Sequence, residues 1–269
     1  AGEREYQRLR TTYYIYNIYD MINDSRFWKS FKTKYAVNNP SKNSIYEQGD
    51  LGIMYVINRP GDTRFSKVEL KDEIVYSKTG KTIPTVFVAY PNDRNNNDDV
   101  ALYDYTNRYA PLSKFIDGSR ESRDSRVGYR DGILARLGET YLIAAEAAVK
   151  ANDNAKALMY INFIRQRAST NAPEGGLPLY SGTITIDDVL DERALELFGE
   201  VSRWNDLTRT GKLAERVLEY NWDVSNINGA VKTELSASTN AKFSLRPIPL
   251  AWLNSLSNGQ ELGNNPGWE

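Results

Sequence analysis

A helical signature runs through the sequence Asp191-Glu192-Arg193-Ala194-Leu195-Glu196-Leu197-Phe198-Gly199-Glu200-Val201-Ser202-Arg203-Trp204-Asn205-Asp206-Leu207-Thr208-Arg209. Apolar side chains recur in it, and just before it, at alternating spacings of four and three residues: Leu190, Ala194, Leu197, Val201 and Trp204. On an α-helix this spacing places all these side chains on one face. The pattern therefore predicts one continuous helix with a buried apolar face.

Charged side chains run beside this apolar face: Glu192, Glu196, Glu200 and Arg203, with Arg193 three residues before Glu196. Helix residues that are three or four positions apart can form ion pairs. Charges next to a buried face are costly to desolvate unless each of them is matched. We therefore expect a matched charge network that fixes how the helix docks, and a structural role for its acids and arginines.

The same residues carry a resemblance to a known family. Together with Asp206 and Arg209, the residues Glu192, Arg193, Glu196, Glu200, Arg203 and Trp204 look like the signature of the SusD/RagB family. Further segments agree with that family: residues 136–147, 161–168, 245–249 and 264–268. The resemblance spans residues 133–269, whereas residues 1–132 match only through residues 24–27 and 114–117.

This resemblance implies a function and a location. Members of the family are outer-membrane lipoproteins on the extracellular face that bind an oligosaccharide or polysaccharide and pass it to a SusC-like TonB-dependent transporter. They are binders and not enzymes, and the resemblance implies no cofactor. Their lipid is attached to an N-terminal cysteine, and this chain contains no cysteine. We therefore expect the anchor to lie outside this chain, and the chain to be the C-terminal portion of a protein about twice as long.

The composition excludes several classes of function. A net charge of −1 gives no electrostatic reason to expect nucleic acid or an anionic membrane as a partner. The absence of cysteine and histidine removes thiolate nucleophiles, the commonest general base and the usual zinc ligands. A hydrophobic content of 41% is that of an ordinary globular protein, without an apolar run long enough to cross a bilayer.

The periodicity changes along the chain. Residues 4–22 predict a helix, and residues 51–57, 68–76 and 82–90 predict strands because β-branched and aromatic residues are bounded there by turn formers. We expect residues 1–132 to be a loop-rich region with short strands that carries the candidate ligand face. Residues 133–269 are expected to be helical, and the two parts to form one structural unit.

The helical part begins with a predicted pair of helices. Its first apolar face consists of Leu134, Leu137, Tyr141, Ala145 and Ala148, and Asn152-Asp153 caps a second helix that ends near Ala168. The spacing is partly that of a tetratricopeptide repeat. The predicted fold class is therefore mainly α: a tetratricopeptide-like helical scaffold with a long irregular loop-rich region containing short strands.

Three further features are predicted towards the C-terminus. Thr185-Ile186-Asp187-Asp188 has the pattern of a capping box that opens the signature helix. The chain after residue 220 is polar and predicts a loop as far as Phe243, and a short helix is expected at residues 250–256.

Aromatic residues are concentrated in the loop-rich region. Fourteen of the 18 tyrosines lie in residues 1–130. A tyrosine offers a flat apolar face and a hydroxyl group at a small entropy cost, which suits sugars. The candidate ligand-binding residues are those in polar, turn-rich surroundings: Trp28, Tyr46, Tyr103 and Tyr105. The alternative is that the tyrosines only pack a helix and strands, as we expect for Tyr13, Tyr14, Tyr16 and Tyr19.

One loop has oxygen-bearing side chains at alternate positions, as a calcium loop does: Asp93, Asn95, Asn97, Asp99 and Asp104. Asp98 stands where such a loop has its turn glycine, and Asp104 stands where it has its bidentate glutamate. These departures favour an ordinary surface turn rich in asparagine and aspartate.

Two other functions compete with glycan binding. A helical-repeat scaffold for a peptide or a transporter would present an apolar groove along its helices. A glycoside hydrolase would need two carboxyl groups roughly 5–10 Å apart across a sugar bond. With 35 acidic residues such a pair can always be found, so the acids alone carry little weight for hydrolysis.

Overall fold

The computed structural model describes residues 11–40, 46–58, 74–78, 81–89, 109–121, 127–172, 175–200, 203–221, 224, 229–236 and 241–268, without the side chains of residues 74–89, 229, 230 and 241. The helices are α1 (Tyr13–Ile18), α2 (Ser25–Ser30), α5 (Leu137–Lys150), α6 (Asn154–Ala168), α7 (Ile186–Glu196), α8 (Arg203–Arg209), α9 (Leu213–Tyr220), α10 (Gly229–Ser236), α11 (Ala241–Ser244), α12 (Leu250–Leu253) and α13 (Gly259–Leu262). The strands are β1 (Lys34–Ala36), β2 (Leu51–Asn58), β3 (Ile74–Lys78) and β4 (Lys81–Ala89).

The chain forms two compact units. The first consists of residues 1–141 and 162–180, and the second of residues 142–161 and 181–269. The structure is mainly helical, which confirms the predicted fold class. Within the described residues, no helix is both long enough and apolar enough to cross a bilayer.

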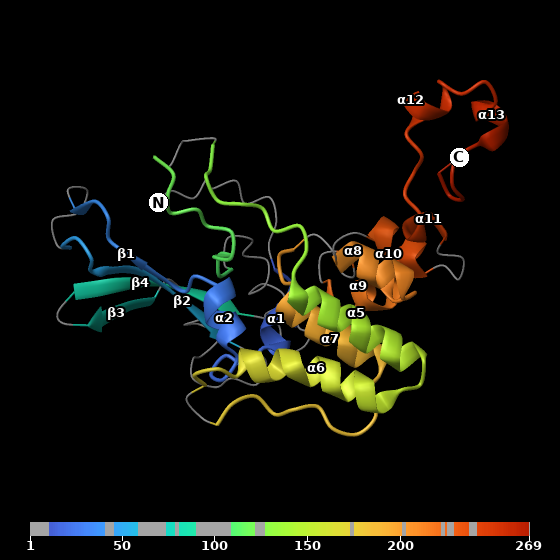
Figure 1. Ribbon diagram of the computed structural model, residues 1–269. Coiled ribbons are helices and arrows are strands. Elements are labelled where there is room, and N and C mark those ends of the chain that lie inside the picture. The colour runs from blue at the N-terminus through green and yellow to red at the C-terminus, as the bar shows by residue number, and fades with distance from the viewer. Residues whose placement is uncertain are drawn as a thin grey trace. The chain divides into compact units, whose positions relative to one another are not determined.

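The first unit contains one four-stranded sheet. Its strand order is β1-β2-β4-β3, as Figure 1 shows for the blue and teal arrows. Strands β2 and β4 pair in parallel, and the two outer strands pair antiparallel to their neighbours. The predicted strands at residues 51–57 and 82–90 are confirmed, and β3 lies at the end of the strand predicted for residues 68–76. The short outer strand β1 was not predicted.

An aromatic core holds the two N-terminal helices together. The ring of Phe31 lies 5.0 Å from that of Tyr16 and 5.2 Å from that of Phe27, and Tyr19 packs edge-on against Phe27. All these side chains are buried. The interpretation of this tyrosine cluster as packing residues is therefore confirmed for Tyr14, Tyr16 and Tyr19. The helix α1 is shorter than the predicted helix, and residues 4–10 lie outside the described part.

A buried ion pair opens helix α2. The carboxylate of Asp24 accepts a hydrogen bond from the backbone N–H of Arg26 at 3.0 Å. It also accepts from Nε and Nη2 of the Arg26 guanidinium at 2.8 and 2.7 Å. Asp24 therefore caps the helix and neutralises the arginine at once. This contact gives residues 24–27, one of the two weak matches in the first half of the chain, a structural role.

The helix pair α5 and α6 confirms the predicted helices with one correction. Ala145 and Ala148 are buried on α5, and Ile161 and Ile164 are buried on α6, where Asp153 accepts the Lys156 N–H as a cap. The predicted start was wrong, because α5 begins at Leu137. Two predicted members of its buried face, Leu134 and Leu137, are exposed, by 99% and 65%. Leu142 and Glu146 are buried instead. The buried face of α5 therefore begins in the middle of the helix and not at its first turn.

The predicted single signature helix was wrong. Helix α7 ends at Glu196, and its last turn closes with the Leu197 N–H donating to the Arg193 carbonyl. Gly199 then adopts a φ of 78°, in the left-handed region that a glycine enters without strain. The buried face therefore ends at Leu197, and Trp204 on α8 is 37% exposed instead of lying on a continuous stripe. Val201 lies outside the described residues.

The second unit packs α7, α8 and α9 around a small apolar core. Leu190, Leu207 and Leu213 are buried together, with Ile186, Val217 and Phe243 against them. The capping box at the start of α7 is confirmed, because the Thr185 hydroxyl accepts from the Asp188 N–H and the Asp188 carboxylate accepts from the Thr185 N–H. The loop predicted after residue 220 was wrong, since α10 and α11 lie within it and Leu235 on α10 is buried.

Candidate functional site

Asp206 of α8 holds an arginine of α7 across the break between the two helices. Arg193 donates from Nε and Nη2 to the two carboxylate oxygens of Asp206, each at 2.8 Å. Arg209 donates from Nη2 to one of the same oxygens at 2.9 Å. The side chains of Arg193 and Asp206 are buried. A bidentate pair restricts both the distance and the relative rotation of its partners, so this pair fixes α8 on α7.

Arg209 also pairs with Glu146 of α5. The same carboxylate accepts a hydrogen bond from Nζ of Lys150, one turn later, at 2.8 Å. Burial alone would raise the pKa of Glu146, but the hydrogen bonds and charges of Arg209 and Lys150 outweigh it and hold the pKa below its ordinary value. Glu146 therefore stays ionised and ties α5 to α8.

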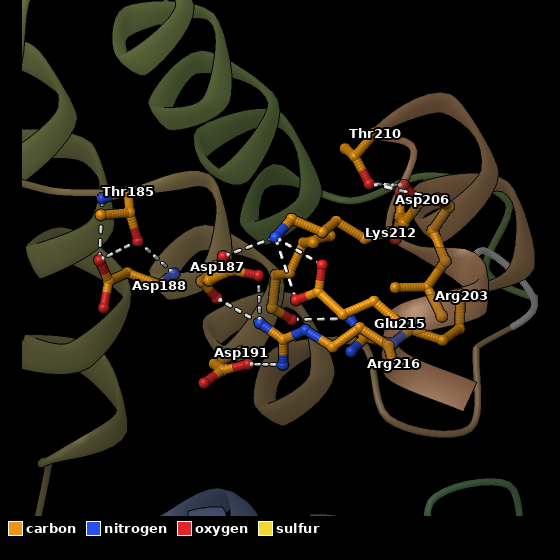
Figure 2. Close-up of polar contacts among 12 residues, drawn as sticks. Thr185, Asp187, Asp188, Asp191, Arg203, Asp206, Thr210, Lys212, Glu215 and Arg216 are labelled. Carbon is orange, nitrogen blue, oxygen red and sulfur yellow. Dashed lines mark hydrogen bonds and ion pairs between the residues drawn. The ribbon is translucent and has the colours of Figure 1, made fainter. Parts of the chain in front are cut away.

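A second cluster of charges joins α7 to α9, as Figure 2 shows. The guanidinium of Arg216 donates from Nη1 to Asp191 at 2.6 Å and from Nη2 to Asp187 at 2.7 Å. Lys212 pairs with the other oxygen of Asp187 at 3.0 Å. Burial raises the pKa of Asp187, but Arg216 and Lys212 together bring it below its ordinary value. The acids at the start of α7 therefore also anchor α9.

The remaining signature residues are also engaged. Arg203 donates from Nη1 to the Leu190 carbonyl at 2.7 Å, and the Arg246 guanidinium lies 5.3 Å from the centre of the Trp204 ring. Glu192 and Glu196 are buried, and both of them, like Glu200, take part in further interactions. A general acid in a hydrolase must reach a bound sugar, whereas these glutamates are engaged with other residues of the protein. These contacts therefore support the structural role that the sequence predicts for the signature.

The last two sequence motifs bind each other. The side-chain amide of Asn264 accepts from the Ile248 N–H at 2.7 Å and donates to the Ile248 carbonyl at 3.1 Å. Asn265 donates to the Arg246 carbonyl at 2.6 Å, and the Trp268 indole donates to the Lys242 carbonyl at 2.7 Å. We call these three side chains and residues 242–248 the C-terminal clasp.

The structure places two of the four candidate ligand residues. Trp28 lies on α2 with its ring edge-on to Phe27 and is 56% exposed, which is unusual for so large an apolar side chain. Tyr46 is half-buried in the segment before β2. Tyr103 and Tyr105 lie outside the described residues. Trp28 is therefore the candidate that the structure leaves most open to a ligand.

Two exposed aromatic side chains of the first unit, Phe115 and Tyr129, are not among the residues predicted from the sequence. Tyr129 is 61% exposed and Phe115 is 47% exposed. Phe115 lies two residues before Asp117, whose carboxylate accepts a hydrogen bond from the Tyr129 N–H. The Arg130 side chain donates to the carbonyl of Ile116, which lies between Phe115 and Asp117. The only sequence signal was that residues 114–117 match the family. No local sequence pattern predicts that Asp117 accepts a hydrogen bond from the backbone of Tyr129, twelve positions later.

The candidate calcium loop is not described. Asp93, Asn95, Asn97, Asp99 and Asp104 all lie outside the described residues. Within the part of the chain that the structure describes, acidic side chains do not gather in a group able to hold a metal ion.

The comparisons with known proteins agree with the motifs. The SusD family matches residues 4–268, nearly the whole chain. The chain belongs to the SusD family. The match includes residues 4–132, where the sequence alone showed only two short similarities.

Relatives of this SusD-family chain come from two genera. SusD-like protein P2 of Formosa agariphila is 29% identical over 73% of this chain and 36% of its own length. SusD-like protein P25 of the same organism is 39% identical over 36% of this chain and 19% of its own length. Starch-binding protein SusD of Bacteroides thetaiotaomicron is 28% identical over 51% of this chain and 21% of its own length. The chain thus spans about a third or less of the curated relatives that it matches.

Glu146 makes the stability of this SusD-family chain depend on pH. Its folded pKa lies below the ordinary value of 4.5, so its contribution to stability is present above that value and is lost as the pH falls through the folded pKa. We expect the variant Glu146→Gln to lose less stability than the wild type between pH 5 and pH 3. Urea denaturation at pH 7, 5, 4 and 3 measures this, and parallel losses in the two proteins would contradict it.

Proposed function

We propose that this chain is the glycan-binding, nutrient-capture component of an outer-membrane polysaccharide uptake system. The match of residues 4–268 to the SusD family carries this proposal. The name of one relative, a starch-binding protein, supports a polysaccharide as the ligand. The exposed ring of Trp28 supplies a flat apolar surface of the kind on which a sugar ring stacks.

The proposal includes a partner and a location. The protein acts on the extracellular face of the outer membrane, where a lipid anchor holds it. It passes its glycan to a SusC-like TonB-dependent transporter. Both points follow from the family and not from a contact in the structure.

We further propose that the protein binds its glycan without cleaving it. The burial of Glu192 and Glu196 and the pairing of Asp206 with two arginines support this, because these acids are occupied in holding helices. Incubation with polysaccharides and an assay for new reducing ends tests the proposal. Release of reducing ends by the purified protein would contradict it.

Within this function Trp28, Tyr46, Tyr103 and Tyr105 are the proposed ligand residues. We expect Trp28→Ala to weaken binding by roughly tenfold, since one aromatic contact is worth up to about 1.5 kcal/mol. Titration calorimetry of the native protein with maltoheptaose, cellohexaose, xylohexaose and mannohexaose measures it. The matched control is Trp252→Ala, because Trp252 is also about half exposed but lies on α12 in the other unit. Equal effects of the two substitutions would remove Trp28 from the site.

A further inference from the structure

Asp117 holds two separate segments of the first unit together. Its carboxylate accepts hydrogen bonds from the backbone N–H groups of Ser119, Tyr129 and Arg130, at 2.9, 2.7 and 3.2 Å. The Arg130 guanidinium donates in return to the Ile116 carbonyl at 3.1 Å. A Cβ atom on residue 128 would lie 2.8 Å from the Asp117 carboxylate, so Gly128 lets the two segments approach. We call residues 115–121 and 127–130 the Asp117 loop pair.

These hydrogen bonds persist over a wide pH range. Hydrogen bonds from Ser119, above all, and from the backbone of Tyr129 lower the pKa of Asp117 to about 2. The carboxylate is therefore ionised, and able to accept all of these hydrogen bonds, at any pH above about 3. The backbone on either side of Tyr129 is thus held by a group that stays charged under ordinary conditions.

The loop pair presents aromatic side chains to solvent from this fixed backbone. Tyr129 is 61% exposed and Phe115 is 47% exposed, although such rings are usually buried in a monomeric protein. The Tyr129 hydroxyl donates to the Glu121 carboxylate at 3.3 Å, which orients the ring. A ring that is already positioned loses little conformational entropy when a ligand binds.

The loop pair is continuous with the segment that carries Trp28. The N–H and hydroxyl of Ser113 donate to the carbonyls of Ser30 and Lys29, at 2.7 and 3.0 Å. The N–H of Ile116 in turn donates to the Ser113 carbonyl at 3.1 Å. A series of hydrogen bonds therefore runs from the end of α2 to the backbone of Tyr129, within one unit of the protein.

We propose that the Asp117 loop pair is a second carbohydrate-binding site, in which Tyr129 stacks on the apolar face of a neutral pyranose ring. Tyr129 provides the flat apolar surface, and the carboxylate of Glu121, next to its hydroxyl, accepts hydrogen bonds from sugar hydroxyls. The same carboxylate disfavours an anionic sugar next to the ring, since like charges repel. Asp117 is a positioning residue that does not touch the glycan. This inference rests on the proposed function and adds to it the residues of a contact that the sequence did not predict.

The test is calorimetry of the native protein with the four neutral oligosaccharides named above. For the glycan that binds, we expect Tyr129→Ala to weaken binding by about tenfold, and Tyr129→Phe by no more than about threefold because the stacking face remains. Val127→Ala is the matched control, since Val127 is 62% exposed on the same loop pair but has no ring. It is expected to leave binding unchanged.

The variant Asp117→Asn separates positioning from contact. We expect it to weaken binding and also to speed hydrogen exchange at the amides of Tyr129 and Arg130, whereas Tyr129→Ala changes binding alone. Binding by Tyr129→Ala equal to that of the wild type would overturn the inference and leave the proposed function standing. Equal losses in Tyr129→Ala and Tyr129→Phe would overturn the stacking contact. Failure of the wild type to bind any of the four glycans would overturn the proposed function, and this inference with it.

Discussion

Replacing Asp206 with alanine is expected to lower the free energy of unfolding by about 3–5 kcal/mol. The substitution removes the shared partner of Arg193 and Arg209 and leaves the guanidinium of Arg193 buried without its bidentate acceptor. Removing one partner of a buried ion pair costs more than forming the pair gains, because the remaining charge loses its matched acceptor. Urea denaturation at pH 7, followed by circular dichroism, measures the change.

Two controls show whether this loss comes from burial. Glu215→Ala removes the acid of an exposed ion pair with Lys212, and we expect a much smaller effect because solvent screens that pair. The double variant Arg193→Met with Asp206→Leu replaces the buried pair by apolar side chains, and we expect it to be more stable than Asp206→Ala. If Asp206→Ala and Glu215→Ala were equally stable, the buried pair would not be what fixes α8 on α7.

The second large effect is expected at Tyr16 in the first unit. Tyr16→Ala should lower the free energy of unfolding by about 3–5 kcal/mol, because it removes a fully buried ring from the aromatic core. The Tyr16 hydroxyl also accepts from the Ala110 N–H at 3.1 Å and donates to the Ala110 carbonyl at 3.4 Å. Tyr16→Phe keeps the ring but removes the hydroxyl with these hydrogen bonds, and it should cost about 1–3 kcal/mol, since Ala110 is buried.

Tyr129→Ala is the matched control for Tyr16→Ala, because it is the same substitution at an exposed tyrosine of the same unit. We expect it to leave the midpoint of thermal unfolding almost unchanged. A loss in Tyr129→Ala as large as that in Tyr16→Ala would mean that Tyr129 packs the fold, and would count against its role as a ligand surface.

Elements with a strong local signal were predicted from the sequence. The capping box at Thr185, the helix α6 with its buried Ile161 and Ile164, and the strands β2 and β4 each depend on residues close together in the chain. Their hydrogen bonds or their packing faces follow from spacing alone. The mainly helical fold class therefore follows from the sequence.

The break between α7 and α8 could not be predicted in the same way. A glycine inside a helical pattern is tolerated in many helices, so Gly199 did not by itself predict an end. The pairing of Arg193 with Asp206, thirteen positions later, joins the two helices across this turn. The sequence predicts that the signature charges are paired. It does not predict which residues pair, because that depends on tertiary structure.

The candidate ligand residues were predicted only in part. Trp28 was selected for its polar, turn-rich surroundings, and its exposure agrees with that choice. Tyr129 was missed because its position depends on Asp117, a residue far away in the sequence. Exposure is a property of the packed chain, and composition indicates only that aromatic residues are abundant nearby.

The C-terminal clasp has a consequence for how this sequence can change. Asn264, Asn265 and Trp268 bind N–H and carbonyl groups, which every residue except proline presents in the same form. Substitution at Arg246 or Ile248 can therefore leave these hydrogen bonds intact, provided that proline does not enter at position 248, whereas the Lys242 ammonium also lies 5.0 Å from the centre of the Trp268 ring. The side chains of Asn264, Asn265 and Trp268 cannot be replaced in this way, because they form the hydrogen bonds themselves. Selection on the C-terminal clasp therefore acts more strongly on these three residues than on residues 242–248.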